Sequence, residues 1–167
     1  MFTNNAFKAY IFSFMALFIV CDTTANQAEL STAPTWQLKT QSGDEISSFQ
    51  YQNKPIILHF WATWCPYCKK LQPKLVELQQ KYAEQGIEIV AISFNEDQGA
   101  TPQDSITERG YTFKTAVDGE FVATNYGVVG TPTTFFINRH GKVVFKTTGS
   151  DINDPRLEQA VMEIVKY

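Results

Sequence analysis

The chain has 167 residues, of which 44% are hydrophobic, and it carries a formal net charge of −3 at pH 7. This length fits one globular domain and is sufficient to bury a full hydrophobic core. Acidic and basic residues are scattered along the chain without a basic stripe, so we expect no nucleic-acid partner.

The first 25 residues predict a secretory signal peptide. Lys8 is followed by an apolar run over residues 9–21 and then by small polar residues. The run is shorter than the roughly 20 residues of a membrane-spanning helix, so we expect cleavage after Ala25. The alternatives are that the N-terminus is kept as an anchor or that Cys21 carries a lipid. We therefore expect a periplasmic or otherwise exported protein.

Cleavage at this point would leave Cys65 and Cys68 as the only cysteines of the mature chain. The mature chain would then have no framework of structural disulfides. In an oxidising compartment, a lone close pair of cysteines indicates the working part of the protein.

The composition after the signal peptide predicts a linker over residues 26–34 and one domain over residues 35–167. Two extended segments, 35–40 and 46–51, flank a turn and predict an opening hairpin. Residues 54–63 form a nearly continuous apolar run, which is typical of a strand buried on both faces of a parallel or mixed sheet.

The apolar period changes at Pro66 and predicts a helix that ends at Gly86, with Pro73 inside it. Residues 87–93 predict a second buried strand, which completes a strand, helix and strand crossover unit. The cysteines therefore lie at a strand-to-helix junction. The apolar face of the helix contains Cys68, Leu71, Leu75, Leu78 and Tyr82.

The rest of the chain predicts two short helices, over residues 101–109 and 120–127, with a strand around residues 113–117 between them. A strand hairpin follows over residues 133–149. Asp154 is the expected N-cap of a final helix.

The start of a helix favours negative charge because its first backbone N–H groups are unpaired. This position can lower the pKa of Cys65 from about 8.5 into the range of about 3.5 to 7.5, which would make it a nucleophile near the surface. Cys68 lies on the apolar face of the helix and is expected to be shielded and to act second. The predicted scheme is attack on a substrate disulfide, formation of a mixed disulfide, and release by the second cysteine.

The pair has three other interpretations. Zinc needs about four ligands, whereas the mature chain offers two cysteines, His59 and His140. A structural disulfide across so short a loop would constrain little of the unfolded chain. A redox-linked protein that binds or delivers copper stays an alternative, because two thiolates and a histidine can hold Cu(I).

Two segments, "FWATWCPYC" and "YGVVGTPTTFFINRHGKVV", together with Pro73, resemble the thioredoxin superfamily, and in particular its exported TlpA/ResA/CcmG-like thiol-disulfide oxidoreductases. The resemblance covers residues 34–167. It implies an α/β thioredoxin-like fold, in which helices flank a central mixed β-sheet. An N-terminal hairpin extension and an inserted helix-strand segment are expected in addition.

The resemblance also implies a cis bond between Thr131 and Pro132, in a loop that faces the cysteines. In the family this loop presents the backbone of the residue before the proline to an extended substrate peptide. Trp64, Pro66 and Tyr67 are expected to border the same binding surface.

Two departures from the family concern the proton of the buried thiol. Thioredoxin has a buried aspartate six residues before its first cysteine, where this chain has His59. Many ResA-like reductases have a glutamate three residues after the second cysteine, where this chain has Leu71. These absences weaken an assignment to cytochrome c maturation. We interpret His59, with an unperturbed pKa of about 6.5, as a candidate base for Cys68, the alternative being a core histidine.

Together these observations predict an exported thiol-disulfide oxidoreductase that reduces protein disulfides, with no metal and no cofactor other than the Cys65–Cys68 disulfide. The resemblance of Pro66 and Tyr67 to glutaredoxins implies a milder reductant than thioredoxin. A membrane protein is the expected electron donor, and a monomer the expected state. A thiol oxidase and a non-catalytic docking module are further alternatives.

Overall fold

The computed structural model describes Met1 and residues 30–166. The expected signal peptide and its cleavage site, Cys21 and the first part of the expected linker lie outside the described residues. Within the described part of the chain, no helix has the length and apolar character needed to cross a bilayer.

A seven-stranded mixed sheet forms the centre of the domain, with the strand order β2-β1-β5-β4-β3-β6-β7. The three strands β3, β4 and β5 are parallel, and all other pairs are antiparallel. The hairpin β1–β2, which the sequence predicted, forms one edge of the sheet. The strands are β1 (Gln37–Thr40), β2 (Glu45–Ser47), β3 (Ile56–Trp61), β4 (Glu88–Ser93), β5 (Lys114–Val117), β6 (Thr133–Ile137) and β7 (Val143–Thr147).

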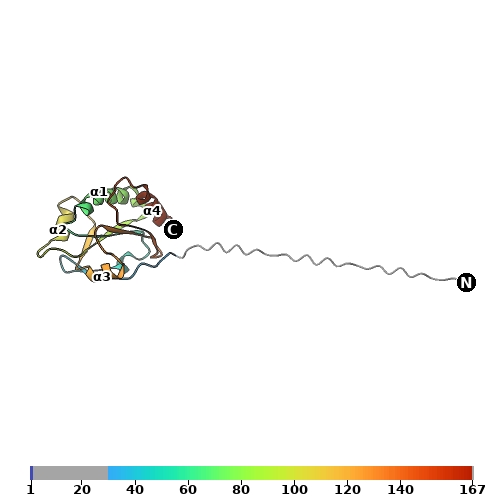
Figure 1. The fold of residues 1–167 in the computed structure, drawn as a ribbon, viewed down its shortest axis with the longest axis horizontal. Coiled ribbons are helices and arrows are strands. Elements are labelled where there is room, and N and C mark those ends of the chain that lie inside the picture. The colour runs from blue at the N-terminus through green and yellow to red at the C-terminus, as the bar shows by residue number, and fades with distance from the viewer. Residues whose placement is uncertain (2–29, 167) are drawn as a thin grey trace.

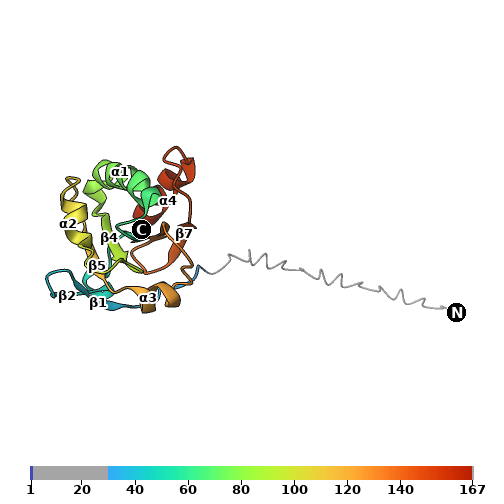
Figure 2. The ribbon, with the colours of Figure 1, turned by 60° about the vertical axis from the view of Figure 1, so that its left-hand side comes forward.

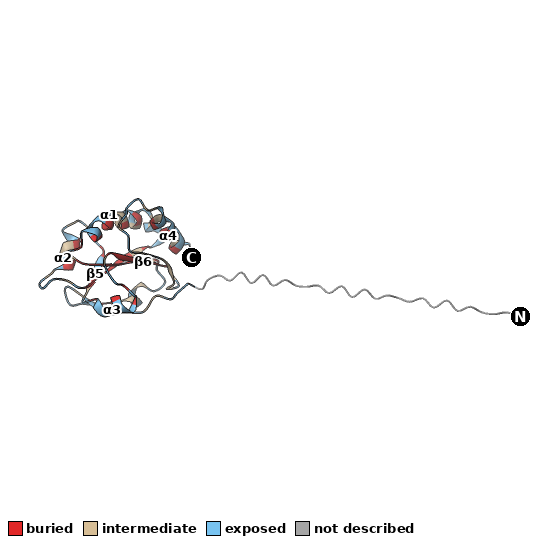
Figure 3. Ribbon diagram, in the orientation of Figure 1, coloured by how far each residue is buried: buried red, intermediate tan, exposed pale blue. Residues whose placement is uncertain are grey.

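Four α-helices cover the two faces of this sheet, with α1, α2 and α4 on one side and α3 on the other (Figures 1 and 2). Each face has its own cluster of buried apolar side chains, and Figure 3 shows the buried residues gathered in the central part of the sheet. This arrangement confirms the predicted thioredoxin-like fold. The helices are α1 (Pro66–Lys81), α2 (Pro102–Thr107), α3 (Glu120–Asn125) and α4 (Pro155–Val165).

The central strand β3 supplies side chains to both faces, because successive residues of a strand point in opposite directions. Ile57 and Trp61 belong to the core under α1 and α4, whereas Leu58 and Phe60 belong to the core over α3. His59 is two residues from both Ile57 and Trp61, so its side chain points to the same face of the sheet, toward α1. The apolar run predicted a strand buried on both faces, and the alternation through Ile57, His59 and Trp61 predicted the face to which His59 points; both are observed.

Local boundaries differ from the sequence prediction in two places. The α1 helix ends at Lys81 and a short 3-10 turn, Ala83–Gln85, leads to Gly86, whose positive φ of 71° reverses the chain. The second arm of the hairpin is extended only over β2, after which Ser48–Tyr51 form another 3-10 turn.

Residues 31–33 pair with the edge of the sheet, although the sequence placed them in the linker. The Val143 N–H donates to the Ser31 carbonyl at 2.9 Å, and the Ala33 N–H donates to the Gly141 carbonyl at 2.9 Å. The ordered domain therefore begins before Thr35. This pairing was not predictable from local composition, because small polar residues are typical of a linker as well as of a short edge strand.

Gly119 gives a test of packing between β4 and the start of α3. A Cβ atom at this position would lie 2.8 Å from the Ser93 carbonyl oxygen and would also collide with Ile92. We expect Gly119→Ala to lower the free energy of unfolding by about 1–3 kcal/mol, the usual cost of overpacking. Urea unfolding measures this loss. Gly130→Ala is the control, because its Cβ would meet no atom within 4 Å, and an equal effect of both changes would contradict the argument.

Candidate active site

The cysteine pair lies where the central strand passes into the first helix. After β3 the Cys65 N–H donates to the Ala62 carbonyl at 3.1 Å, and α1 begins at Pro66. Cys65 is the N-cap of α1, and its Sγ accepts a hydrogen bond from the Cys68 N–H at 3.1 Å. The two cysteines form a disulfide with their Cα atoms 5.4 Å apart. An otherwise unpaired N–H of the helix start is therefore directed at the Cys65 sulfur.

Both cysteines of the disulfide are covered, with exposed fractions of 1% for Cys65 and 0% for Cys68. Cys65 is nearer the helix start, as predicted, but in the oxidised protein it does not reach the surface. Trp64 and Tyr67 beside it are 51% and 62% exposed and form the accessible surface at this point. A partner thiol must therefore displace part of this cover before it can attack the Cys65 sulfur.

The loop before β6 approaches the cysteine pair from the neighbouring strand. The Thr131–Pro132 peptide bond is cis, as the resemblance implied, and Pro132 is buried. The Thr133 hydroxyl donates to the Gly130 carbonyl at 2.7 Å, which closes the loop. Because Thr133 pairs with Phe60 near the end of β3, the loop lies beside the segment that leads to Cys65.

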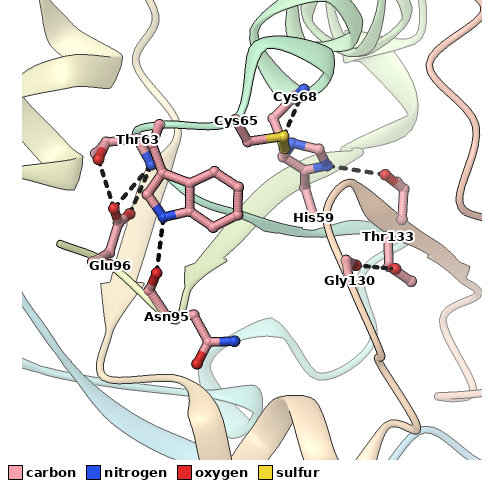
Figure 4. The surroundings of a disulfide bond; sticks show 10 residues. His59, Thr63, Cys65, Cys68, Asn95, Glu96, Gly130 and Thr133 are labelled. Carbon is pink, nitrogen blue, oxygen red and sulfur yellow. Dashed lines mark hydrogen bonds between the residues drawn. A yellow bond between two sulfur atoms is a disulfide. The ribbon is translucent and has the colours of Figure 1, made fainter.

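His59 is fully buried, and Figure 4 shows its imidazole beneath the cysteine pair, as the strand alternation predicted. Its Nδ1 shares a hydrogen bond of 2.9 Å with the Thr134 hydroxyl, whereas its Nε2 is buried without a partner. Burial, assisted by the positive charge of Arg109, lowers the pKa of His59 from 6.5 to about 3. The premise that His59 keeps an unperturbed pKa is therefore wrong, because a charged imidazole loses its hydration here.

Stability against pH tests this burial. Between about pH 3 and pH 6.5 the unfolded chain binds a proton at His59 that the folded protein excludes, so the free energy of unfolding falls as the pH falls through this window. We expect a shallower fall in His59→Asn, because asparagine does not titrate. Urea unfolding over this pH range measures the difference, with the exposed His140→Asn as control. Identical pH profiles for the wild type and His59→Asn would contradict it.

A carboxylate that the sequence analysis missed fixes the segment before Cys65. Glu96 accepts hydrogen bonds from the Thr63 N–H at 2.9 and 3.0 Å, the Thr63 hydroxyl at 2.6 Å and the Ser93 hydroxyl at 2.6 Å. The Trp64 indole N–H donates to the Asn95 carbonyl at 2.8 Å. Figure 4 shows Glu96 beside Thr63. The sequence could have indicated this contact. The predicted strands β3 and β4 are parallel, so the segments that follow them, with Thr63 and Glu96, leave the same edge of the sheet.

Two more polar side chains on the α1 side of the sheet were missed. Gln72 lies one turn after Cys68 on the buried face of α1, and neither polar atom of its amide has a hydrogen-bond partner. Arg109, just after α2, has both terminal guanidinium nitrogens buried without a partner. Gln72 stands among polar residues that are typical of the solvated face of a helix. Arg109 is the last residue of the helix predicted over residues 101–109, where a charged side chain is typical of a solvated helix end.

His140 does not join the other candidate zinc ligands. His140 is exposed in the turn between β6 and β7, at the Ile56 end of β3, whereas the cysteines follow the other end of this strand. Across residues 30–166, no group of three or more histidine, cysteine, aspartate and glutamate side chains is arranged to hold a metal ion.

A disulfide at the first turn of a helix, opposite a cis-proline loop on a mixed sheet, defines the thioredoxin-fold thiol-disulfide oxidoreductases. Residues 30–146 match the AhpC/TSA family. The chain is 34% identical over 134 residues to the thiol-disulfide oxidoreductase ResA of Bacillus thuringiensis subsp. konkukian, which covers 79% of this chain and 76% of that protein. It is 38% identical over 122 residues to ResA of Geobacillus thermodenitrificans, with coverages of 72% and 69%.

Solved structures show the same likeness. The structure of a putative thiol:disulfide interchange protein DsbE from Chlorobium tepidum superposes with a TM-score of 0.71 and 28% identity, over 81% of this chain and 96% of that one. The chain belongs to the AhpC/TSA family, and it is a thiol-disulfide oxidoreductase similar to the ResA proteins.

Proposed function

We propose that this thiol-disulfide oxidoreductase works outside the cytoplasm and reduces disulfides of other proteins through Cys65 and Cys68. The observation that carries the proposal is the hydrogen bond from the Cys68 N–H to the Cys65 sulfur at the start of α1. When the pair is reduced, this donor and the helix dipole favour a thiolate at Cys65. Cys68 has no such donor in this structure and lies deeper, which fits it for the second step.

The reaction then follows in two exchanges. The Cys65 thiolate attacks one sulfur of the substrate disulfide, forms a mixed disulfide, and releases the other substrate sulfur as a thiolate that takes up a proton. Cys68 loses its proton and attacks the Cys65 sulfur, which forms the Cys65–Cys68 disulfide and releases the second substrate thiol. Two electrons pass from the protein to the substrate. A thiol donor, for which we propose a membrane protein, must reduce the pair again.

The docking surface in this proposal is formed by Trp64, Pro66 and Tyr67 on one side and by Thr131 and Pro132 on the other. The exposed rings of Trp64 and Tyr67 can contact a partner, and the indole is held in place by its hydrogen bond to Asn95. An extended peptide beside Thr131 would pair through its backbone, which suits substrates of varied sequence.

His59 enters the proposal as a relay for the proton of Cys68. With a pKa of about 3 it does not hold a proton near neutrality, so it cannot be the resting acid. Its unpartnered Nε2 lies beneath the pair, where it can take the proton of Cys68 only during the attack and give it to the substrate thiolate that leaves Cys65.

The composition of residues 1–25 supports export, with cleavage after Ala25 as the proposed processing and an uncleaved N-terminus or a lipid on Cys21 as alternatives. We propose a monomer. Leu71 and His59 replace the acids of relatives, which weighs against a role in cytochrome c maturation. Copper delivery stays the alternative, although within residues 30–166 no group of three or more histidine, cysteine, aspartate and glutamate side chains is arranged to hold a metal ion.

The order of the two cysteines can be tested by alkylation of the reduced protein near neutral pH. We expect iodoacetamide to modify Cys65 about tenfold or more faster than Cys68, because only a thiolate reacts readily. Mass spectrometry of peptides identifies the modified residue. Cys68→Ala should retain its substrates as mixed disulfides, which can be isolated from an exported fraction, whereas Cys65→Ala should retain none. Faster modification of Cys68 would reverse the assigned roles.

The relay predicts a specific kinetic defect in His59→Asn. We expect mixed disulfides to resolve about tenfold or more slowly, because the proton of Cys68 loses its local acceptor. Alkylation of Cys65 should stay nearly unchanged, since this thiol does not depend on the imidazole. Stopped-flow release of a labelled peptide measures the resolving step. Wild-type rates in folded His59→Asn from about pH 6 to pH 8 would make His59 a structural residue.

A further inference from the structure

Arg109 places a positive charge inside the domain on the same side of the sheet as the cysteines. Its Nε donates to the Ser105 carbonyl at 3.0 Å, while both terminal nitrogens are buried without a hydrogen-bond partner. The guanidinium carbon lies 5.6 Å from the centre of the Trp61 ring and 5.8 Å from that of Tyr111. The charged end of the side chain is therefore held between aromatic rings rather than in water.

This cation has no counter-ion among the described residues. The ion pairs recorded there lie elsewhere, at the surface of the domain. An arginine stays charged in a protein, and a buried charge is unfavourable unless a group of opposite sign compensates it. The faces of the two rings supply part of the compensation. A group that becomes negative only in one redox state could supply the rest.

The charge of Arg109 reaches the interior beneath the redox pair. Trp61, the ring it covers, is fully buried in one apolar cluster with Cys65 and Cys68. The same charge contributes to the low pKa of His59, which Figure 4 places under the disulfide. In an interior of low dielectric constant, a charge acts over longer distances than in water.

Few other charges face this region within residues 30–166. From β3, His59 is neutral, and Leu71 of α1 is apolar. Lys69 and Lys70 of α1 are exposed to solvent, which screens them. The opposing charge is Glu96, a half-buried carboxylate that hydrogen bonds to the segment before Cys65. Arg109, a half-buried residue whose terminal guanidinium nitrogens are fully covered, is thus the cation that faces this interior, and Glu96 is the carboxylate of opposite charge.

We propose that Arg109 stabilises the thiolate of the reduced Cys65–Cys68 pair and thereby makes the disulfide a stronger oxidant. In the equilibrium with glutathione, one protein disulfide and two glutathione thiols give two protein thiols and one glutathione disulfide. Two electrons pass to the protein, and the thiol formed at Cys65 loses its proton to solvent. A cation that favours this thiolate shifts the equilibrium toward the reduced protein.

The inference rests on the proposed function only in taking Cys65 and Cys68 as the redox pair, and it bears on the direction of electron flow. A pair whose reduced form is stabilised accepts electrons more readily, so Arg109 moves the protein toward thiol oxidation.

The test compares the full mature chain with Arg109→Met, which removes the charge and keeps an apolar stem, and Arg109→Lys, which keeps a cation. Arg139→Met is the matched control, because this arginine lies in the turn between β6 and β7, at the other end of the sheet. If Arg109→Met does not fold, Arg109→Gln provides the uncharged variant. Circular dichroism confirms folding before each measurement.

Two measurements report on the charge of Arg109 and not on its packing. Absorbance of the thiolate against pH should show a higher pKa for Cys65 in Arg109→Met, with Arg109→Lys close to the wild type. The equilibrium constant for reduction by glutathione should fall about three- to tenfold, where tenfold corresponds to about 30 mV. Unchanged titration and equilibrium in folded Arg109→Met, or an equal shift in Arg139→Met, would overturn the proposal. Neither readout requires a protein substrate, so failure of the proposed reductase activity would be recognised separately.

Discussion

The structure of the site depends on one unpaired amide at the start of α1. The Cys68 N–H has no carbonyl partner within the helix, and its hydrogen bond to the Cys65 sulfur holds that sulfur at the N-terminal end of the helix. The central strand β3 delivers the chain to this point, between a parallel and an antiparallel neighbour. Those neighbours supply the two supports of the pair, the Glu96 segment after β4 and the cis-proline loop before β6.

Much of this fold could be predicted from the sequence because its determinants are local. The alternation through Ile57, His59 and Trp61 set the faces of β3, and Asp154 caps α4 through its own side chain as expected. The strand-to-helix junction at Pro66 followed from a change of period. The cis bond at Pro132 is different, because no period or spacing indicates it, and only the resemblance to a family did so.

What the sequence could not supply depends on contacts between distant segments. Glu96 meets Thr63 across 33 positions of the chain, and Arg109 reaches Trp61 across a greater distance still. The pKa of His59 was misjudged for the same reason, since its depth and its charged neighbour are properties of the assembled domain. The burial of Cys65 likewise arises from packing between distant segments, whereas the local sequence pattern predicts that Cys65 lies at the helix start.

The pairing of residues 31–33 with the edge strand β7 also fixes where the N-terminal chain leaves the domain. Ala33 hydrogen bonds to Gly141, in the turn at the opposite end of β3 from the cysteines. If the N-terminus were kept as an anchor, it would hold the domain at the end opposite the cysteines. The redox face would then project away from the anchoring surface and stay open to partners arriving from the surrounding medium, without a long spacer.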